Sequence, residues 1–164
     1  MKTVMTVRHA VPEDIEAIFG LLELYSGSGV VLPRSREDIA EHLGNFRVAV
    51  AEDGIVGCAA VRDFGNDLLE VRSLVVHPRS QGRGVGKLIL REIVAELRRT
   101  RSAWRLFALT QRPEFFRGLG FREVTKALFP EKIWSDCSKC RKRRCCDEAA
   151  VLLDAAEVTD GSGN

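Results

Sequence analysis

Apolar residues recur along the chain at two different periods, one helical and one extended. Between positions 15 and 25 they fall every three or four residues and predict an amphipathic helix, preceded by a short strand at 4–8. The apolar face of that helix consists of Ile15, Ile18, Phe19, Leu22 and Tyr25. Ser35 and Asp38 have the spacing of a capping box, which predicts a second, short helix ending near Leu43.

The middle of the chain has the pattern of a strand-rich layer. Apolar runs at 46–51 and 55–61 flank the turn Glu52-Asp53-Gly54 and predict a hairpin. A longer strand follows at 68–76, and Val85 to Leu97 predicts a strongly amphipathic helix. The remaining expected elements are a strand at 104–109, a helix at 113–119, a strand at 121–124 and a final strand at 149–153. This order predicts a mixed α/β layer.

Length and composition narrow the class of protein. The chain has 164 residues, of which 45% are hydrophobic and 29% charged, so it has the balance of one globular domain. We expect a single domain over 1–153, with a basic, cysteine-rich segment at 126–148 and a disordered tail at 154–164. No apolar run reaches the roughly 20 residues that cross a bilayer, and the first residues lack a signal-peptide pattern. These features predict a cytoplasmic protein without a membrane partner.

Charge argues against a nucleic-acid-binding protein. The formal net charge is only +2, from 25 basic and 23 acidic side chains. Basic residues cluster at 98–105, where they suit a helix C-terminus, and again at 139–144. The balance is too even for a protein that wraps nucleic acid.

The strongest chemical signal is a glycine-rich turn between the strand at 68–76 and the following helix. Gly82, Gly84 and Gly86 alternate there, and Lys87 follows. Glycine lets a backbone approach a ligand closely, and the N–H groups of a first helical turn attract anions. A diphosphate would fit this turn. The glycines follow the fourth expected strand, which is not the position of a Rossmann fingerprint, and the Gly-Lys-Ser/Thr ending of a P-loop is absent.

The turn resembles the acetyl-CoA signature of the GNAT-type N-acetyltransferase superfamily, Gln/Arg-x-x-Gly-x-Gly/Ala. The matching residues are Gln81, Gly82, Arg83, Gly84, Val85 and Gly86. A second mark of the superfamily, an aromatic residue shortly before Leu-Gly-Phe, is present at Phe116 to Phe121. The resemblance implies a mixed, mostly antiparallel sheet that is splayed between its fourth and fifth strands and flanked by helices on both faces. It also implies acetyl-CoA as co-substrate, lying in the gap between those strands.

Several further segments are similar to the short, single-domain N-acetylglutamate synthases of bacterial arginine biosynthesis. They are 32–35, 70–74, 107–110 with 114–116, and Lys132 to Cys140, with 146–148 fitting the end of the pattern. This resemblance implies transfer of an acetyl group from acetyl-CoA to the α-amino group of L-glutamate by direct attack in a ternary complex.

Two charged residues of the strand at 68–76 suit that chemistry. An amino acid is mostly ammonium at neutral pH, and Glu70 is the candidate base that removes its proton through water. Strand alternation predicts Glu70, Arg72, Leu74 and Val76 on one face. Arg72 is a candidate for one substrate carboxylate, and Arg34 or Lys132 for the other. A structural ion pair between Glu70 and Arg72 is the alternative.

The resemblance assigns the remaining cofactor contacts. Backbone N–H groups of Leu74, Val75 and Val76 polarise the thioester oxygen, residues 81–87 hold the pyrophosphate, and Thr110 and Phe116 also contact the cofactor. The superfamily often has a tyrosine at the position of Phe116, where it protonates the leaving thiolate. The sequence therefore shows no general acid, and the CoA thiol is acidic enough to leave as thiolate or to take a proton from solvent.

Four of the five cysteines lie close together, at Cys137, Cys140, Cys145 and Cys146. Cys137 and Cys140 have the first half of a zinc-knuckle spacing, but a clean second pair is missing. Zinc ligation and a metal-free loop over the substrate site both remain open. Cys58 fits a buried, small apolar residue, and the three histidines form no metal set.

Two other functions stay open at this point. One is acetylation of another small amine or of a protein amine. The other is a non-catalytic module that senses acetyl-CoA or binds nucleic acid through the basic, cysteine-rich segment. A homodimer is compatible with the sequence but does not follow from it.

Overall fold

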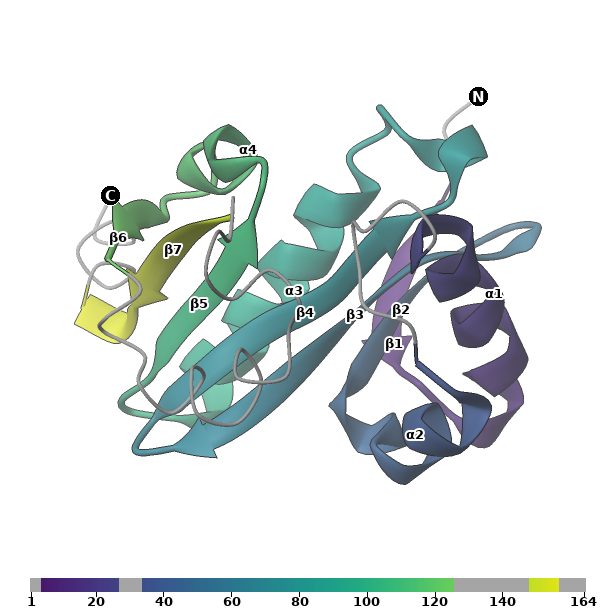
Figure 1. Cartoon of the computed structure of the whole chain (residues 1–164), viewed down its shortest axis with the longest axis horizontal. Helices are drawn as coiled ribbons and strands as arrows, with labels where there is room; N and C mark the ends of the chain where they lie inside the picture. The colour runs from purple at the N-terminus through teal and green to yellow at the C-terminus, as the bar shows by residue number, and fades with distance from the viewer. Residues whose placement is uncertain (1–3, 27–33, 126–147, 157–164) are drawn as a thin grey trace. The chain divides into compact units, whose positions relative to one another are not determined.

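The computed structural model describes residues 4–26, 34–125 and 148–156 (Figure 1). The four helices of these residues are α1 (Ile15–Ser26), α2 (Arg36–Glu41), α3 (Val85–Thr100) and α4 (Pro113–Arg117). The strands are β1 (Thr6–His9), β2 (Phe46–Ala51), β3 (Gly54–Gly65), β4 (Leu68–Val76), β5 (Arg105–Thr110), β6 (Arg122–Val124) and β7 (Ala149–Asp154). Among the described residues, no helix is long and apolar enough to cross a membrane.

The strands form one mixed sheet in the order β1-β2-β3-β4-β5-β7-β6. The pairs β1/β2, β2/β3, β5/β7 and β6/β7 are antiparallel, whereas β4 and β5 are parallel. The parallel pairing covers only three residue pairs and ends at Glu70 and Phe107, although β4 continues to Val76 and β5 to Thr110. The predicted mixed, mostly antiparallel layer with helices is confirmed.

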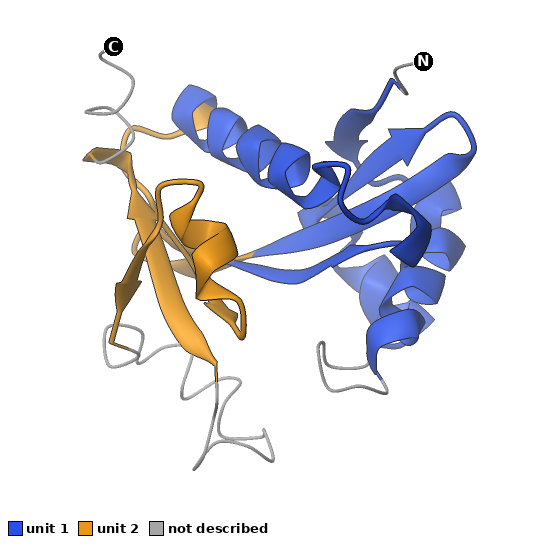
Figure 2. Ribbon diagram, turned by 90° about the horizontal axis from the view of Figure 1, so that it is seen from above, with its two compact units in different colours: residues 1–61, 71–99 blue, residues 62–70, 100–164 orange. Residues whose placement is uncertain are grey.

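The chain divides into two compact units, coloured separately in Figure 2. Unit 1 comprises residues 1–61 and 71–99, and unit 2 comprises residues 62–70 and 100–164. The boundary crosses β3 and β4, so each of these strands contributes to both units. Each unit is described separately below.

Unit 1 carries helices on both faces of its strands (Figure 2). One core joins α1 and α2 to the sheet through Ile18, Leu22, Ile39, Phe46 and Cys58, each at most 1% exposed. The next residue along β3 from Cys58, on its N-terminal side, is Gly57, and it faces α3. A Cβ at Gly57 would lie 2.9 Å from Val85 Cγ1 and 3.2 Å from the Val75 carbonyl oxygen, so only glycine lets the first turn of α3 approach this closely. Strand alternation therefore separates the two helical faces.

Unit 2 is built around β5 and β7, whose residues pair from Arg105 with Asp154 to Thr110 with Ala149. Leu68, Phe107, Ala150 and Leu152 form its buried cluster. Phe64 packs on Phe107 with ring centroids 6.1 Å apart. An exposed ion pair also belongs to this unit, in which Arg101 donates to Asp63 at 2.9 Å.

Most boundaries of the elements agree with the sequence patterns to within about two residues, the largest difference is at the end of β3, and β7 also ends later than predicted. β3 extends to Gly65, four residues beyond the predicted end. The sequence pattern missed this part because its apolar run is interrupted by Arg62 and Asp63, which are partly or fully exposed, whereas Phe64 still packs inward on Phe107. The predicted disordered tail begins too early, because Asp154 is the last residue of β7 and pairs with Arg105. Residues 157–164 lie outside the described part of the chain.

Candidate active site

The junction between β4 and α3 lies entirely in unit 1 and contains the glycine-rich turn. β4 ends at Val76, and the His77 N–H donates to the Val56 carbonyl oxygen at 2.8 Å, which fixes the strand end against β3. A short 3-10 turn at Pro78–Ser80 follows, in which the Arg79 N–H donates to the His77 Nδ1 at 3.1 Å. The turn is therefore stabilised by a hydrogen bond between its own residues, before the glycine-rich segment begins.

Gly82 and Gly84 have backbone angles that the other L-residues rarely adopt. Their φ values are 81° and 79°, and a Cβ at either position would meet no atom within 4 Å. The requirement for glycine is therefore conformational, and the space next to the backbone is open. Gly84 closes the segment, because its carbonyl oxygen accepts the first bond of α3 from the Leu88 N–H at 3.0 Å.

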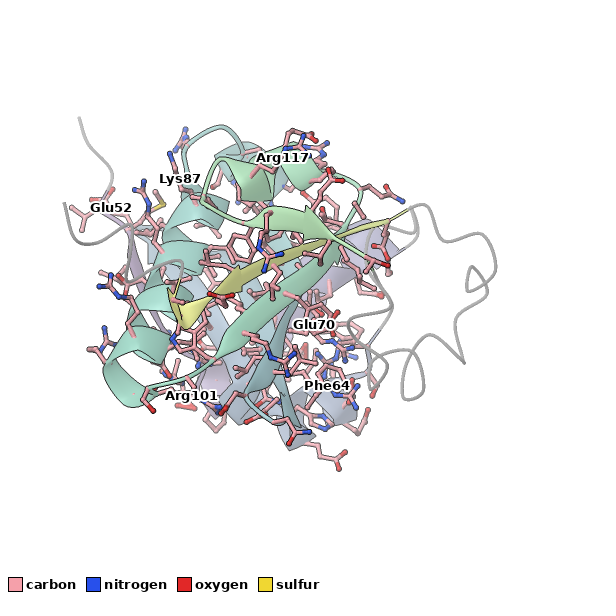
Figure 3. All side chains as sticks on the ribbon, turned by 90° about the vertical axis from the view of Figure 1, so that its left-hand side faces the viewer. Glu52, Phe64, Glu70, Lys87, Arg101 and Arg117 are labelled. Carbon is pink, nitrogen blue, oxygen red and sulfur yellow. The ribbon has the colours of Figure 1, made fainter. Side chains whose placement is uncertain are left out.

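The start of α3 suits a negatively charged ligand. The first N–H groups of a helix have no partner within the helix, and the helix dipole adds positive potential there. The first turn of α3 contains no acidic residue, and Arg83 and Lys87 are exposed beside it. The side chain of Lys87 points outward from the helix in Figure 3. A diphosphate is the ligand chemistry that this arrangement fits best.

Ser73 interrupts the regular course of β4 in unit 1. Its φ of 55° lies in the left-handed region, which costs about 1–2 kcal/mol for a residue with a Cβ. The simple alternation predicted from Arg72 to Leu74 and Val76 therefore does not hold through Ser73. A residue with a left-handed backbone within a strand locally disrupts the pairing of the backbone N–H groups with the adjacent strand. Beyond it, the Val75 side chain is buried, while Leu74 and Val76 are half-buried.

Glu70 is one of three buried polar or charged side chains among the described residues, at 3% exposure. It belongs to unit 2, where it is the last residue of β4 that pairs with β5, opposite Phe107 (Figure 3). Burying a carboxylate is costly unless the group is paired or hydrogen-bonded. A buried Glu70 at the end of the paired segment is compatible both with a role in catalysis and with a structural ion pair.

Arg34 and Arg72, the two arginines predicted to bind carboxylates, both belong to unit 1. The contacts of Cys58 relate their positions. Arg34 lies close enough to Cys58 for its charge to oppose the burial that raises the pKa of this thiol to about 12. Cys58 in turn donates from Sγ to the Ser73 carbonyl oxygen at 3.7 Å, and Ser73 follows Arg72. Cys58 itself is 0% exposed, which confirms it as a buried, small residue.

Arg34 is held in place by two contacts. Its Nε donates to Asp38 Oδ2 at 2.6 Å, and its guanidinium lies over the Phe46 ring at 4.9 Å from the centroid. The hydrogen bond from Arg34 holds the pKa of the Asp38 carboxyl below its usual value. Since this bond uses Nε, the two Nη atoms lie outside the ion pair. An arginine fixed in this way loses little side-chain entropy when it binds a ligand.

Thr110 and Phe116 lie in unit 2, at the end of β5 and in α4. The Thr110 Oγ1 accepts from the Arg112 N–H at 2.9 Å, which shapes the turn into α4. Phe116 is only 5% exposed and packs edge-on against Phe115 and Phe121. The aromatic residue before Leu-Gly-Phe therefore has a packing role that needs no hydroxyl.

Some predicted site residues fall outside the described residues, namely Lys132 and the cysteines Cys137, Cys140, Cys145 and Cys146. Within the described part, the ligand atoms of Asp38, Glu41 and His42 come within 4.8 Å of one another. Asp38 is already paired with Arg34 and accepts from His42, so this group offers a divalent cation little net negative charge. It does not change the expectation that the histidines form no metal set.

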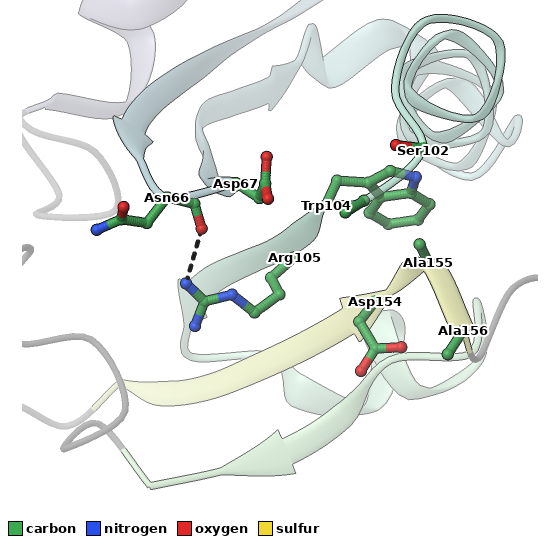
Figure 4. Close-up of a pocket in the computed structure, with 9 residues that line it drawn as sticks. Asn66, Asp67, Ser102, Trp104, Arg105, Asp154, Ala155 and Ala156 are labelled. Atoms are coloured by element: carbon green, nitrogen blue, oxygen red, sulfur yellow. Dashed lines mark hydrogen bonds between the residues drawn. The ribbon is translucent and has the colours of Figure 1, made fainter.

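An open pocket of unit 2 lies at the other end of β5 from Thr110 (Figure 4). It is lined by the turn at 66–67, by the approach to β5 at 102–105 and by the end of β7 at 154–156. The Arg105 side chain donates to the Asn66 carbonyl oxygen at 3.1 Å, and its backbone N–H donates to the Asp67 carbonyl oxygen at 2.7 Å. None of the predicted site residues lines this pocket.

Two residues of unit 1 were not predicted to shape the site. Tyr25 was expected on the apolar face of α1, but its hydroxyl reaches Val76 and Gln81. The only signal in the sequence is that a tyrosine, which carries a polar tip, occupies an apolar position. No signal in the sequence marks Ser73, because the positive φ of a serine inside a strand is determined by tertiary contacts.

A model of the acetyltransferase (GNAT) domain family matches residues 42–123, half of the chain. The chain belongs to the GNAT acetyltransferase family. The matched region contains β2 to β5, the glycine-rich turn with α3, and α4. The family relationship shows an acetyl-CoA-dependent acetyltransferase, as the resemblance implied.

Two relatives and one solved structure illustrate the relationship. An uncharacterized N-acetyltransferase of Chlorobaculum tepidum is 38% identical over 146 residues, covering 89% of this chain and 94% of the relative. An amino-acid acetyltransferase of Mycobacterium tuberculosis is 33% identical over 121 residues, covering 72% of this chain and 68% of the relative. The N-acetylglutamate synthase of Neisseria gonorrhoeae, in complex with coenzyme A and N-acetyl-glutamate, has a TM-score of 0.81 at 27% identity. The match covers 94% of this GNAT chain and only 36% of that longer one.

Proposed function

We propose that this GNAT enzyme transfers the acetyl group of acetyl-CoA to the α-amino group of L-glutamate, giving N-acetylglutamate and CoA. The observation that carries the proposal is the junction of β4 and α3, with its positive-φ glycines, open space and acid-free first helical turn. Gln81 to Lys87 hold the pyrophosphate there. The amino-acid acceptor is supported by the names of the relatives, and glutamate by the N-acetylglutamate synthase of Neisseria gonorrhoeae.

The reaction removes two protons from the acceptor nitrogen, which changes from an ammonium to an amide, and exchanges a C–S bond for a C–N bond. Glu70 takes a proton from the glutamate ammonium through a water molecule, which frees the nitrogen lone pair. The nitrogen attacks the thioester carbonyl carbon, the C–N bond forms, and the C–S bond breaks as CoA leaves as the thiolate. The nitrogen, positively charged after the attack, loses its second proton to the thiolate or to solvent. Backbone N–H groups of Leu74 to Val76 stabilise the developing negative charge on the carbonyl oxygen.

Direct attack is favoured over an acetylated enzyme by the state of Cys58. A nucleophilic cysteine must be accessible and ionised, whereas Cys58 is fully buried and burial raises its pKa to about 12. Among the described residues no other cysteine is available for this role. In the proposed mechanism, the acetyl group passes directly between two substrates bound together.

The acceptor carries two carboxylates, and each needs a cationic partner. Arg72 binds one of them, and Arg34, which is held by Asp38 and lies near Cys58, binds the other, with Lys132 as the alternative. Leaving one carboxylate unpaired in a partly desolvated pocket costs about 1 to 3 kcal/mol. This cost is what separates glutamate from a neutral amino acid of similar size.

The proposal is tested by replacing Arg72 and following CoA release with acetyl-CoA and L-glutamate. Arg72→Gln raises the KM for glutamate about tenfold or more and leaves the KM for acetyl-CoA unchanged. Arg98→Gln, at an exposed position in the last turn of α3, removes the same charge and serves as the control. Mass spectrometry identifies the product. Equal effects of the two variants, or acetylation that does not depend on glutamate, would contradict the proposal.

A further inference from the structure

Tyr25 lies at the end of α1 and contacts both sides of the junction between β4 and α3. Its hydroxyl donates to the Val76 carbonyl oxygen at 2.5 Å, and the Gln81 Nε2 donates to the same hydroxyl at 2.7 Å. All three residues belong to unit 1. One phenol oxygen therefore joins the last residue of β4 to the first residue of the glycine-rich turn.

The direction of these two bonds is fixed by chemistry. A carbonyl oxygen can only accept, so the single hydroxyl proton of Tyr25 goes to Val76. The hydroxyl oxygen can then only accept from Gln81, which requires the amide nitrogen of Gln81 to face it. The orientation of the Gln81 side chain thus follows from the bond that Tyr25 makes to the strand.

The position of Gln81 gives this bond its importance. The segment from His77 to Ser80 is closed by its own hydrogen bonds, from Arg79 to His77 and from the Ser80 N–H to the His77 carbonyl oxygen at 2.8 Å. After Gln81 the chain enters the exposed glycines Gly82 and Gly84, where a Cβ would meet no atom within 4 Å, and the next buried residue is Val85 in α3. Gln81 is therefore the point at which a contact from α1 can fix the direction of the chain before it enters the glycines.

We propose that Tyr25 is a positioning residue for acetyl-CoA, which holds Gln81 and the end of β4 so that residues 82–87 are arranged for the pyrophosphate before it binds. The proposal rests on the proposed cofactor site at Gln81 to Lys87. The hydroxyl proton of Tyr25 is engaged by Val76, so we assign Tyr25 a positioning role and not that of the missing general acid. Preorganisation of this kind increases affinity without changing the chemical step.

The test separates the pyrophosphate from the thioester. Tyr25→Phe keeps the ring and removes the hydroxyl, and its steady-state kinetics are measured with acetyl-CoA and with S-acetylpantetheine, the same thioester without the nucleotide and pyrophosphate. The expected result is a three- to tenfold higher KM for acetyl-CoA, an unchanged kcat and no change with S-acetylpantetheine. An equal loss with both thioesters, or no loss with either, would overturn the role of Tyr25.

A double-mutant cycle adds a second criterion. Gln81→Met removes the amide and keeps the length of the side chain, so it breaks the same bond from the other side. The effects of Tyr25→Phe and Gln81→Met on the KM for acetyl-CoA are expected to be non-additive, with the double variant little worse than Tyr25→Phe alone. Additive effects would show that the two residues act separately.

A readout without turnover is available because Tyr25 is the only tyrosine of the chain. Protein labelled with carbon-13 at the tyrosine ζ position gives one resonance, which is expected to shift when CoA is added and to stay in place with pantetheine. An unchanged resonance at saturating CoA would contradict the proposed role of Tyr25 in binding the cofactor.

Failure of the underlying site is distinguished with two glycine variants. Gly84→Ala and Gly65→Ala introduce the same methyl group at φ values of 79° and 84°, each with no atom within 4 Å. Their backbone strain is matched, and only Gly84 belongs to the cofactor turn. If the two variants bound acetyl-CoA equally well, both the site and the role of Tyr25 would be wrong. If only Gly84→Ala lost affinity while Tyr25→Phe did not, the site would stand and the role of Tyr25 would be wrong.

Discussion

The ring of Phe116 packs edge-on against the ring of Phe121, with centroids 5.3 Å apart and an interplanar angle of 75°. The Phe121 N–H also donates to the Phe116 carbonyl oxygen at 3.1 Å, so α4 and the chain leading into β6 are joined by backbone and side chain. In other members of the superfamily this position often holds a tyrosine that serves as a general acid. Here packing explains the aromatic residue, and the reaction has to proceed without a phenol at this position.

Phe116→Tyr is therefore expected to leave kcat within about threefold of the parent, since the CoA thiolate leaves without an acid. Phe116→Ala is expected to lower the free energy of unfolding by about 3 to 5 kcal/mol, because it removes a buried ring. Urea denaturation and steady-state kinetics measure the two effects. A rise in kcat of tenfold or more in Phe116→Tyr would show that protonation of the thiolate limits the parent enzyme.

Glu70→Gln is expected to lower kcat by about 10²- to 10⁴-fold at neutral pH, the usual contribution of a general base. The loss shrinks as the pH rises, because more of the acceptor is already present as free amine. Glu52→Gln makes the same chemical change at an exposed turn between β2 and β3 and serves as the control (Figure 3). A Glu70→Gln enzyme with a full rate near pH 7, or with a loss independent of pH, would contradict the assigned role.

Asp14 is expected to stabilise the start of unit 1 in a pH-dependent way. Arg8 donates to it from Nη1 at 2.7 Å and from Nη2 at 3.1 Å, and these hydrogen bonds hold the pKa of Asp14 below its usual value despite burial. The stabilisation is therefore complete above about pH 4, where an unfolded aspartate is ionised, and is lost as the pH falls through the lower folded pKa. Asp14→Asn is expected to cost about 1 to 3 kcal/mol at neutral pH.

The measurement for Asp14 is urea denaturation from pH 3 to pH 7. The difference between the parent and Asp14→Asn should shrink toward acid, whereas the exposed control Asp53→Asn should differ little at any pH. A constant difference across this range would show that the ion pair with Arg8 is not its source.

Cys58 is expected to resist alkylation in the folded protein. It is 0% exposed, and burial raises the pKa of its thiol to about 12, so almost no thiolate is present at pH 8. Because this pKa is raised, the protein should lose stability as the pH rises from about 9, where an unfolded thiol ionises, toward 12. Differential alkylation with peptide mapping should label Cys58 only after denaturation. Rapid labelling in the native state would contradict its burial.

The sequence predicted the elements of the cofactor turn well because local signals determine them. The bounds of β4 agree with the apolar run at 68–76, since Pro78 ends it, and the apolar face of α3 follows a helical period. The predicted glycine-rich turn is present, and Gly82 and Gly84 have positive φ values, which glycine adopts readily. These features depend on neighbours in the sequence, so the sequence alone reveals them.

The contacts between distant segments could not be predicted in the same way. Tyr25 and Gln81 are 56 positions apart, and the helical period placed Tyr25 on an apolar face without indicating that its hydroxyl meets a strand end. The left-handed backbone of Ser73 likewise depends on the packing of β3 and β4 and has no signature in a serine. Arg34 as a carboxylate-binding residue stays a prediction, and its ion pair with Asp38 and its proximity to Cys58 could be found only from the fold.

The preference for L-glutamate is the central claim, and one comparison of acceptors tests it directly. CoA release is measured with saturating acetyl-CoA over L-glutamate, L-glutamine, L-aspartate and L-leucine, and kcat/KM is compared. Two paired carboxylates predict that L-glutamate exceeds L-leucine by about fivefold to 150-fold, which corresponds to about 1 to 3 kcal/mol. If glutamate were no better an acceptor than leucine, the dicarboxylate site would be wrong and the enzyme would be a general acetyltransferase of small amines.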